Sequence, residues 1–403
     1  MKYTVEEVMQ YVEMEDVRFI RMAFCDVFGK LKNIAILPTE LERAFRYGIA
    51  IDASAIAGFG GEVKSDLFLH PDPSTLSSLP WRSENGKVIR MFCTITYPDG
   101  TPFDSDCRAI LQKAIDEAEQ AGISFSFASE IEFYLFKTDE NGEPTKEPYD
   151  HAGYLDVAPE DKGENVRREI CITLSQMGIK PESSHHEEGP GQNEIDFRYS
   201  DPMTAADNAL TFRSVVKAVA SRYGLYAEFS PKPLPNEAGS GQHINISVKA
   251  PGIPNAFNQL ISGIMSQICD ITAFLNPCNE SYQRLGSRKA PKYVSWSSEN
   301  RSQLIRIPAA PAIAPRVELR SPDPEANPYL AYALLIYAGL YGIEHKLALP
   351  DSADFNFFNA PLDVLQKYQQ LPSSFEQAAA IASNSEFVKA NLPEAIISAY
   401  CSR

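Results

Sequence analysis

Several classes of protein are excluded by what this 403-residue sequence contains little of. Lys and Arg total only 37 against 53 Asp and Glu, a formal net charge of -16, whereas nucleic-acid-binding and membrane-surface proteins carry a basic face. The longest apolar stretch, residues 330–343, falls short of the roughly 20 residues that span a bilayer. We therefore expect neither nucleic acid nor a membrane as a partner, and any anion must bind at a local basic site.

Cysteine motifs and phosphate-binding loops are also missing. The seven cysteines form no CxxC pair and no zinc-like spacing, which predicts reduced thiols in a cytoplasmic protein. The N-terminal residues contain no apolar segment of the kind found in signal peptides. No glycine loop of the P-loop or kinase type is present. Any nucleotide site must therefore be of another kind.

The order of the predicted elements indicates an α+β fold. Residues 97–108 are dense in turn-forming and acidic residues and are expected to separate two domains, 1–103 and 104–403. Beyond them, short strands with charged residues at alternate positions are separated by longer helices, which favours an antiparallel sheet. The apolar stretch at 330–343 follows Asn-Pro, a cap and a first helical residue, and is predicted to be a buried helix.

The charged strand residues are candidate metal ligands. Glu130 and Glu132 are two apart, so a strand directs both carboxylates to one face. On a desolvated face they repel unless a cation lies between them; taken alone, the pair also fits a solvated edge strand. Residues 188–194 predict a tight turn that returns Glu194 beside Glu187. His243 follows a glycine-rich turn, although a lone strand histidine is more often structural.

A basic segment balances these acids. Between residues 284 and 320 the sequence has eight Lys or Arg and two acidic residues, which favours a polyanion site. Within it, Arg316, Glu318 and Arg320 share one strand face. This ladder is either a self-satisfied salt-bridge stripe or a carboxylate metal ligand flanked by two phosphate-binding arginines. Carboxylates, an imidazole and several arginines together are typical of metal-assisted phosphoryl transfer.

Eight motifs in a fixed order cover about residues 50 to 345 and resemble those of the glutamine synthetase family, of the bacterial type. They are IDASAIAGF…SDLFLHPDPST, EIEFYLF, AGYLDVAPEDKGENVRRE, HHEEGPGQNEIDFRYSD, PKPLPNEAGSGQH, NPCNESYQRL, NRSQLIRIP and RVELRSPDPEANPYLAYALLIYAGL. The resemblance implies an N-terminal β-grasp domain and a catalytic domain whose antiparallel sheet forms a funnel of the glutamine synthetase/guanido kinase type. ATP is expected at one end of the funnel and glutamate at the other.

The resemblance also implies a ligase. ATP would phosphorylate a side-chain carboxylate to an acyl phosphate, and an amine would then displace phosphate to form an amide. Two or three Mg²⁺ or Mn²⁺ ions are expected with ATP. A homo-oligomer is implied as well, a hexameric ring or two rings stacked as a dodecamer, with active sites shared between subunits.

Roles for single residues follow from the matched motifs. One metal ion is expected at Glu132, Glu187 and Glu194, and a second at Glu130, His243 and Glu318. ATP and the transferring phosphoryl group are expected at Arg301, Arg306, Arg316, Ser247 and Tyr199. The substrate end is expected at Arg284, Arg320, Gly239 and Tyr154, with Asp52 contributed by the neighbouring subunit beside the ammonium site. Catalytic roles are expected for Asp52, for Arg301 and for position 289 of the mobile flap.

Departures from the family concentrate at the amine and amino-acid end. Lys289 stands where the family has a glutamate that shields the acyl phosphate and helps deprotonate ammonium. Ala238 replaces an asparagine that contacts the backbone end of glutamate, Ala55 a serine, and Asn245 a histidine. A lysine at the flap position cannot hold a cation and would repel ammonium.

Three functions therefore stay open. The first is a glutamine synthetase that uses glutamate and ammonia. The second is a ligase of the same chemistry with another amine or carboxylate, such as a γ-glutamylamide synthetase. The third is a non-catalytic relative with a structural or regulatory binding role, which the retention of all six expected metal ligands disfavours.

Overall fold

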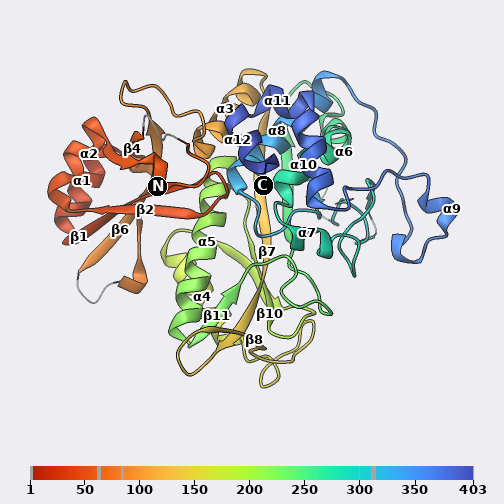
Figure 1. Cartoon of the computed structure of the whole chain (residues 1–403), viewed down its shortest axis with the longest axis horizontal. Coiled ribbons are helices and arrows are strands. Elements are labelled where there is room, and N and C mark those ends of the chain that lie inside the picture. The colour runs from red at the N-terminus through yellow and green to blue at the C-terminus, as the bar shows by residue number, and fades with distance from the viewer. Residues whose placement is uncertain (1–2, 61–64, 83–85, 299, 310–314, 403) are drawn as a thin grey trace.

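Two β-sheets and their surrounding helices make up the chain in the computed structural model. The structure describes residues 3–60, 65–82, 86–298, 300–309 and 315–402. Figure 1 shows the first sheet at the left, the second running down through the centre, and a group of helices near the C-terminus above it.

The first sheet is formed by the N-terminal part of the chain. Its strand order is β2-β1-β6-β4-β3, with β5 paired to β6. The pair β1–β6 is parallel and the other pairs are antiparallel. The central strand β6 is buried along most of its length, as its run of apolar residues requires. The strands are β1 (Val17–Cys25), β2 (Leu31–Ile36), β3 (Ile49–Asp52), β4 (Asp66–Pro71), β5 (Ser77–Ser78) and β6 (Lys87–Thr96).

The second sheet carries the candidate site. Its order is β13-β14-β15-β12-β7-β10-β9, with β8 and β11 also paired to β7. All its pairs are antiparallel except β13–β14, so the predicted antiparallel sheet is confirmed apart from that short pair. The strands are β7 (Ser124–Thr138), β8 (Pro144–Pro148), β9 (Pro181–His186), β10 (Gln192–Phe197), β11 (Leu225–Glu228), β12 (Gln242–Lys249), β13 (Trp296–Ser297), β14 (Ile305–Arg306) and β15 (Val317–Leu319).

Strand β7 separates an apolar face from an acidic one. Ile131, Phe133 and Leu135 are buried in a cluster with helices α4 (Glu164–Gln176) and α5 (Pro202–Arg222). Because successive side chains of a strand point to opposite faces, Glu130 and Glu132 face away from these helices. The same alternation that marked the strand in the sequence therefore fixes where its carboxylates point.

Helices α6 (Ala256–Leu275) and α8 (Pro328–Glu344) pack against each other beside the second sheet, whereas α1 (Val5–Met14) and α2 (Leu41–Tyr47) lie with the first sheet (Figure 1). Helix α8 begins at Pro328 with Asn327 as its cap, whose side chain accepts a hydrogen bond from the Tyr329 N–H. Helices α6 and α8 cross where Gly263 and Gly342 allow their backbones to meet. The other α-helices are α3 (Cys107–Gln120), α7 (Asn279–Arg284), α9 (Leu362–Leu365), α10 (Phe375–Asn384), α11 (Glu386–Asn391) and α12 (Glu394–Cys401).

The predicted buried helix at 330–343 is confirmed by α8. Nearly all of its side chains are buried. Its length and hydropathy do not make it a membrane span, and no other helix within the described ranges is long and apolar enough to cross a bilayer.

One hydrophobic cluster contains residues of both sheets, and buried polar contacts also join them. The carbonyl oxygen of Val27 accepts hydrogen bonds from Asn327 Nδ2 and Tyr400 Oη, each 3.0 Å long. Buried Arg108 forms ion pairs with Asp72 at 2.8 Å and Asp207 at 3.2 Å. These contacts join the β1–β2 connection and the end of β4 to the helices beside the second sheet.

Candidate active site

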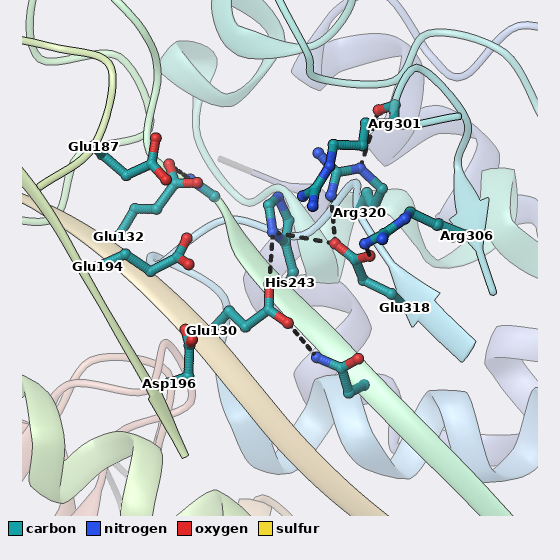
Figure 2. Close-up of polar contacts among 12 residues, drawn as sticks. Glu130, Glu132, Glu187, Glu194, Asp196, His243, Arg301, Arg306, Glu318 and Arg320 are labelled. Atoms are coloured by element: carbon teal, nitrogen blue, oxygen red, sulfur yellow. Dashed lines mark hydrogen bonds and ion pairs between the residues drawn. The ribbon is translucent and has the colours of Figure 1, made fainter. Parts of the chain in front are cut away.

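A cavity of about 750 Å³ lies over the acidic face of the second sheet. Carboxylates line one side of it and arginines the other, with His243 between them (Figure 2). A larger cavity of about 850 Å³ lies between the first sheet and helices α3 and α5, but none of the sequence-predicted site residues line it. The chemistry of the lining, rather than volume, therefore selects the smaller cavity as the candidate site.

The acidic side is built from β7 and the hairpin of β9 and β10. Glu194 on β10 lies opposite Glu132 on β7 and opposite His185 on β9. The Glu187 N–H donates to the Gln192 carbonyl oxygen at 2.8 Å and closes the turn. The prediction that this turn returns Glu194 beside Glu187 is therefore confirmed.

The possible metal-binding atoms form two groups whose members differ from those of the two predicted metal sites. One ligand atom each from Glu130, Glu194 and His243 lie within 4.8 Å of one another, and so do those of His185, Glu187 and Glu194. Glu194 thus belongs to both groups, which brings them close together.

Two predicted metal ligands stand outside these groups. Glu132 Oε2 accepts hydrogen bonds from the Gly241 N–H at 2.8 Å and from Gln192 Nε2 at 3.0 Å. Glu318 is held by arginines. Both still belong to the same site, since Glu132 lines the cavity and Glu318 lies 3.5 Å from His243 Nδ1.

A third group of possible ligands, Asp150, Asp161 and His186, is fully buried beneath the hairpin. His186 Nε2 lies 2.8 Å from Asp150, and the Arg167 guanidinium pairs with Asp161. Because these charges are already matched, the group serves to hold the hairpin.

Burial and mutual repulsion raise the pKa values of several carboxylates in the site. Burial and the neighbouring Glu187 raise the pKa of Glu132 to about 7. Burial and Glu132 raise the pKa of Glu194 well above its usual range, and burial and Glu130 raise that of Asp196 to about 6. Such shifts mean that the cluster carries more negative charge than its surroundings stabilise, which a cation would offset.

His243 behaves in the opposite way. Burial, and then the positive charge of Arg320, hold the pKa of this histidine well below its usual range. The imidazole is therefore neutral near pH 7, the form in which a ring nitrogen can bind a metal ion.

On the basic side, Glu318 is the centre of an ion-paired ladder. It is 1% exposed and pairs with Arg306 at 2.8 Å and with Arg320. Of the two interpretations left open for this ladder, the salt-bridge stripe fits Glu318 and Arg320, but the second arginine is Arg306, which lies opposite Glu318 in the β14–β15 pair. Arg316 lines the cavity, as do Arg301 and Arg306.

Two glycines make room for the arginine at the end of α7. A Cβ on Gly241 would lie 2.6 Å from Arg284 Nη2 and 2.8 Å from His243 Nε2. A Cβ on Gly239 would lie 2.8 Å from Arg284 Cγ. The Arg284 guanidinium donates to the backbone carbonyls of Ser321 at 2.8 Å and Arg320 at 3.1 Å, and it lines the cavity.

Four predicted residues do not line this cavity, namely Glu318, described above, and Tyr199, Ser247 and Asp52. Tyr199 lines a neighbouring cavity of about 280 Å³ together with Arg316 and Asn245. Ser247 lies further along β12, where its Oγ donates to the Pro315 carbonyl at 3.2 Å. Asp52 is exposed at the end of β3 on the first sheet.

Three acidic or imidazole residues of the lining were given no role from the sequence, although two of them, His185 and Glu188, are conspicuous in the HHEEGPGQNEIDFRYSD motif. The third is Asp196. Asp196 and His185 are each two positions from a predicted ligand, on β10 and before the β9–β10 turn, so the period of two that found Glu130 and Glu132 would also have found them.

Comparison with known families decides the identity of this fold and site. The profile of the glutamine synthetase catalytic domain matches residues 104–403, and that of the glutamine synthetase β-grasp domain matches residues 16–98. The chain belongs to the glutamine synthetase family. The first sheet is accordingly its β-grasp domain, and the second sheet is the core of its catalytic domain.

Relatives named glutamine synthetase match most of the length of the chain. One from Clostridium saccharobutylicum is 45% identical over 371 residues, covering 89% of this chain and 84% of its own. One from Methanosarcina mazei is 43% identical over 412 residues, covering 98% and 92%. One from Staphylococcus aureus strain Mu50 is 41% identical over 404 residues, covering 96% and 90%.

Solved structures of the family have the same fold. A GmaS/ADP complex superposes with a TM-score of 0.88 at 25% identity, covering 98% of this chain and 94% of its own. GmaS without ligand gives a TM-score of 0.87 at the same identity and coverage. Glutamine synthetases are ATP-dependent ligases that use divalent metal ions, and this chain is an enzyme of that class.

Proposed function

We propose that this enzyme joins a carboxylate to an amine through an acyl phosphate, with glutamate and ammonia as its default substrates. The observation that carries the proposal is the composition of the 750 Å³ cavity, in which a carboxylate cluster and an arginine group face each other across a neutral histidine. Positioning and charge neutralisation are the main requirements of phosphoryl transfer.

The donor set fits hard divalent cations. Carboxylate oxygens and one neutral imidazole suit Mg²⁺ or Mn²⁺, and the raised pKa values of Glu132 and Glu194 indicate uncompensated negative charge at the same place. We propose two or three Mg²⁺ or Mn²⁺ ions, held by Glu130, Glu132, Glu187, Glu194, His243 and Glu318. When bound, they would neutralise the phosphate oxygens during transfer.

The arginines are proposed to hold the anions. Arg301, Arg306 and Arg316 would bind the phosphates of ATP, with Ser247 and Tyr199 on the nucleotide. Arg306 reaches the cavity while pairing with Glu318, so its position is fixed before ATP binds. The substrate carboxylate oxygen then attacks the γ-phosphorus and ADP leaves. An amine nitrogen next attacks the acyl carbon, phosphate leaves, and the amine loses a proton.

The substrate end is proposed at Arg284, Arg320 and Gly239. Arg284 and Arg320 are 3% exposed, and a buried guanidinium favours a carboxylate strongly. Ala238 in the same loop offers a methyl group where relatives offer an amide, and Lys289 changes the flap. These two positions support the alternative proposal of another amine or another carboxylate, as in a γ-glutamylamide synthetase.

A shared active site is proposed for the assembly. Asp52 is exposed and lies on the first sheet, outside the lining of the cavity, which supports a role in the cavity of a neighbouring subunit. The proposed assembly is a hexameric ring or a dodecamer. All seven cysteines are free thiols, which supports the proposed cytoplasmic location.

A coupled assay of ATP hydrolysis tests the function. Glutamate is supplied with and without ammonium, and then with a panel of amines and carboxylates, in Mg²⁺ or Mn²⁺. Ammonium-dependent formation of glutamine supports the default proposal, and dependence on another amine or acid supports the alternative. Turnover with no pair, despite bound Mn²⁺ and nucleotide, overturns both and favours a non-catalytic role.

A further inference from the structure

The flap residue Lys289 does not point into solvent as a free cation. Its Nζ forms an ion pair with Glu188 and lies 5.4 Å from the centre of the Tyr154 ring. A carboxylate on one side and an aromatic face on the other is the arrangement that recognises an ammonium group. Lys289, Glu188 and Tyr154 all line the 750 Å³ cavity.

The two residues that hold this ammonium are fixed to the acidic side of the site. The Glu188 N–H donates to Glu187 Oε2 at 3.0 Å. The Tyr154 ring packs edge-on against His185 at 5.4 Å, and His185 Nε2 lies 3.0 Å from Glu187 Oε1. Glu188 and Tyr154 are therefore positioned by the candidate metal ligands and not by Lys289.

The flap also has anchors of its own. Arg288 Nη2 donates to the Asn236 carbonyl at 2.8 Å and lies 3.5 Å from a carboxylate oxygen of Glu237. Within the loop, the Ala290 N–H donates to the Ser287 carbonyl at 3.0 Å. These contacts hold the loop in place without the Lys289 side chain. That side chain is 54% exposed, so it can move away from Glu188 and Tyr154 while the loop stays in position.

We propose that Glu188 and Tyr154 form a binding site for the ammonium group of the amine substrate, and that Lys289 occupies this site as an intramolecular competitor. The proposal rests on the proposed ligase function for the identity of the amine. Lys289 presents its ammonium on a four-carbon chain, so the site accommodates a primary alkylammonium ion as well as ammonium itself. The proposal also changes the expected role of position 289. A lysine alone would repel a cation, but here the carboxylate of Glu188 neutralises its charge.

Steady-state kinetics test the competition. Lys289→Ala removes the competing ammonium group from the site. The KM for ammonium or methylammonium should therefore fall about tenfold, because a partly exposed ion pair and a cation–π contact together favour the occupied site by about that factor. Lys292→Ala, a charge loss in the same loop, is the matched control and should leave KM unchanged. An unchanged or higher KM in Lys289→Ala overturns the proposal.

A second measurement does not depend on turnover. The full-length protein is acetylated with a water-soluble reagent, and the ratio of labelling at Lys289 to that at Lys292 is read by mass spectrometry. Methylammonium chloride should raise this ratio above that in equal sodium chloride, and Glu188→Gln should raise it without added amine. A ratio that responds to neither overturns the proposal. Absence of ligase turnover would instead count against the proposed function, with the labelling result still deciding this site.

Discussion

Replacement of Glu318 by alanine separates the structural and chemical roles of the arginine ladder. This carboxylate is 1% exposed and pairs with Arg306 and with Arg320, itself 3% exposed. Glu318→Ala leaves both guanidinium groups without their shared partner. Removing one member of a buried ion pair costs about 3–5 kcal/mol, a large share of the roughly 5–15 kcal/mol by which domains are stable.

The assay is denaturant unfolding of the metal-free protein, followed by Mn²⁺-dependent ATP turnover on the same preparation. We expect the free energy of unfolding to fall by about 3–5 kcal/mol and turnover to be abolished even under conditions where the variant is folded. Glu344→Ala, at the exposed end of α8, is the control for both. Unchanged stability would refute the buried ladder, and surviving turnover would refute the assignment of Glu318 to a metal ion.

Three further changes test other parts of the account. Lys289→Glu should lower the KM for ammonium, because it replaces the tethered cation with a carboxylate; a higher KM would count against the flap assignment. Burial raises the pKa of Asp106 to about 6, above the unfolded value of about 3.9. The free energy of unfolding should therefore be highest below about pH 4 and should fall by about 3 kcal/mol as the pH rises from 4 through 6. Denaturant titrations of Asp106→Asn should lack this decline. Gly263→Ala should lower the unfolding free energy by about 1–3 kcal/mol, since its Cβ would overlap the Ala338 carbonyl oxygen; equal thermal stability would contradict this contact.

Local patterns carried the sequence predictions that the structure confirms. Alternation along β7 sends Glu130 and Glu132 to one face because Ile131 and Phe133 must be buried against α4 and α5. Helix α8 follows from a cap, a proline and an unbroken apolar run that needs burial on all sides. In each case the signal and the structure involve the same few consecutive residues.

Contacts between distant segments were not predictable in this way. Arg306 replaces Arg316 as a partner of Glu318 because β14 pairs with β15, a register that no spacing in the sequence specifies. Likewise, Lys289 and Glu188 belong to separate turns whose meeting depends on how the flap folds over the cavity. The family resemblance supplied the roles of both arginines, but only the packing of strands gives their partners.

Oxygen transfer tests the central claim, formation of an acyl phosphate at this cavity, most directly. The enzyme is given ATP, an amine and glutamate labelled with ¹⁸O in its side-chain carboxylate, and the released phosphate is analysed by mass spectrometry. Attack of the carboxylate oxygen on phosphorus predicts one labelled oxygen in each phosphate released. Phosphate that carries no label would contradict the account, since water rather than the carboxylate would then have received the phosphoryl group.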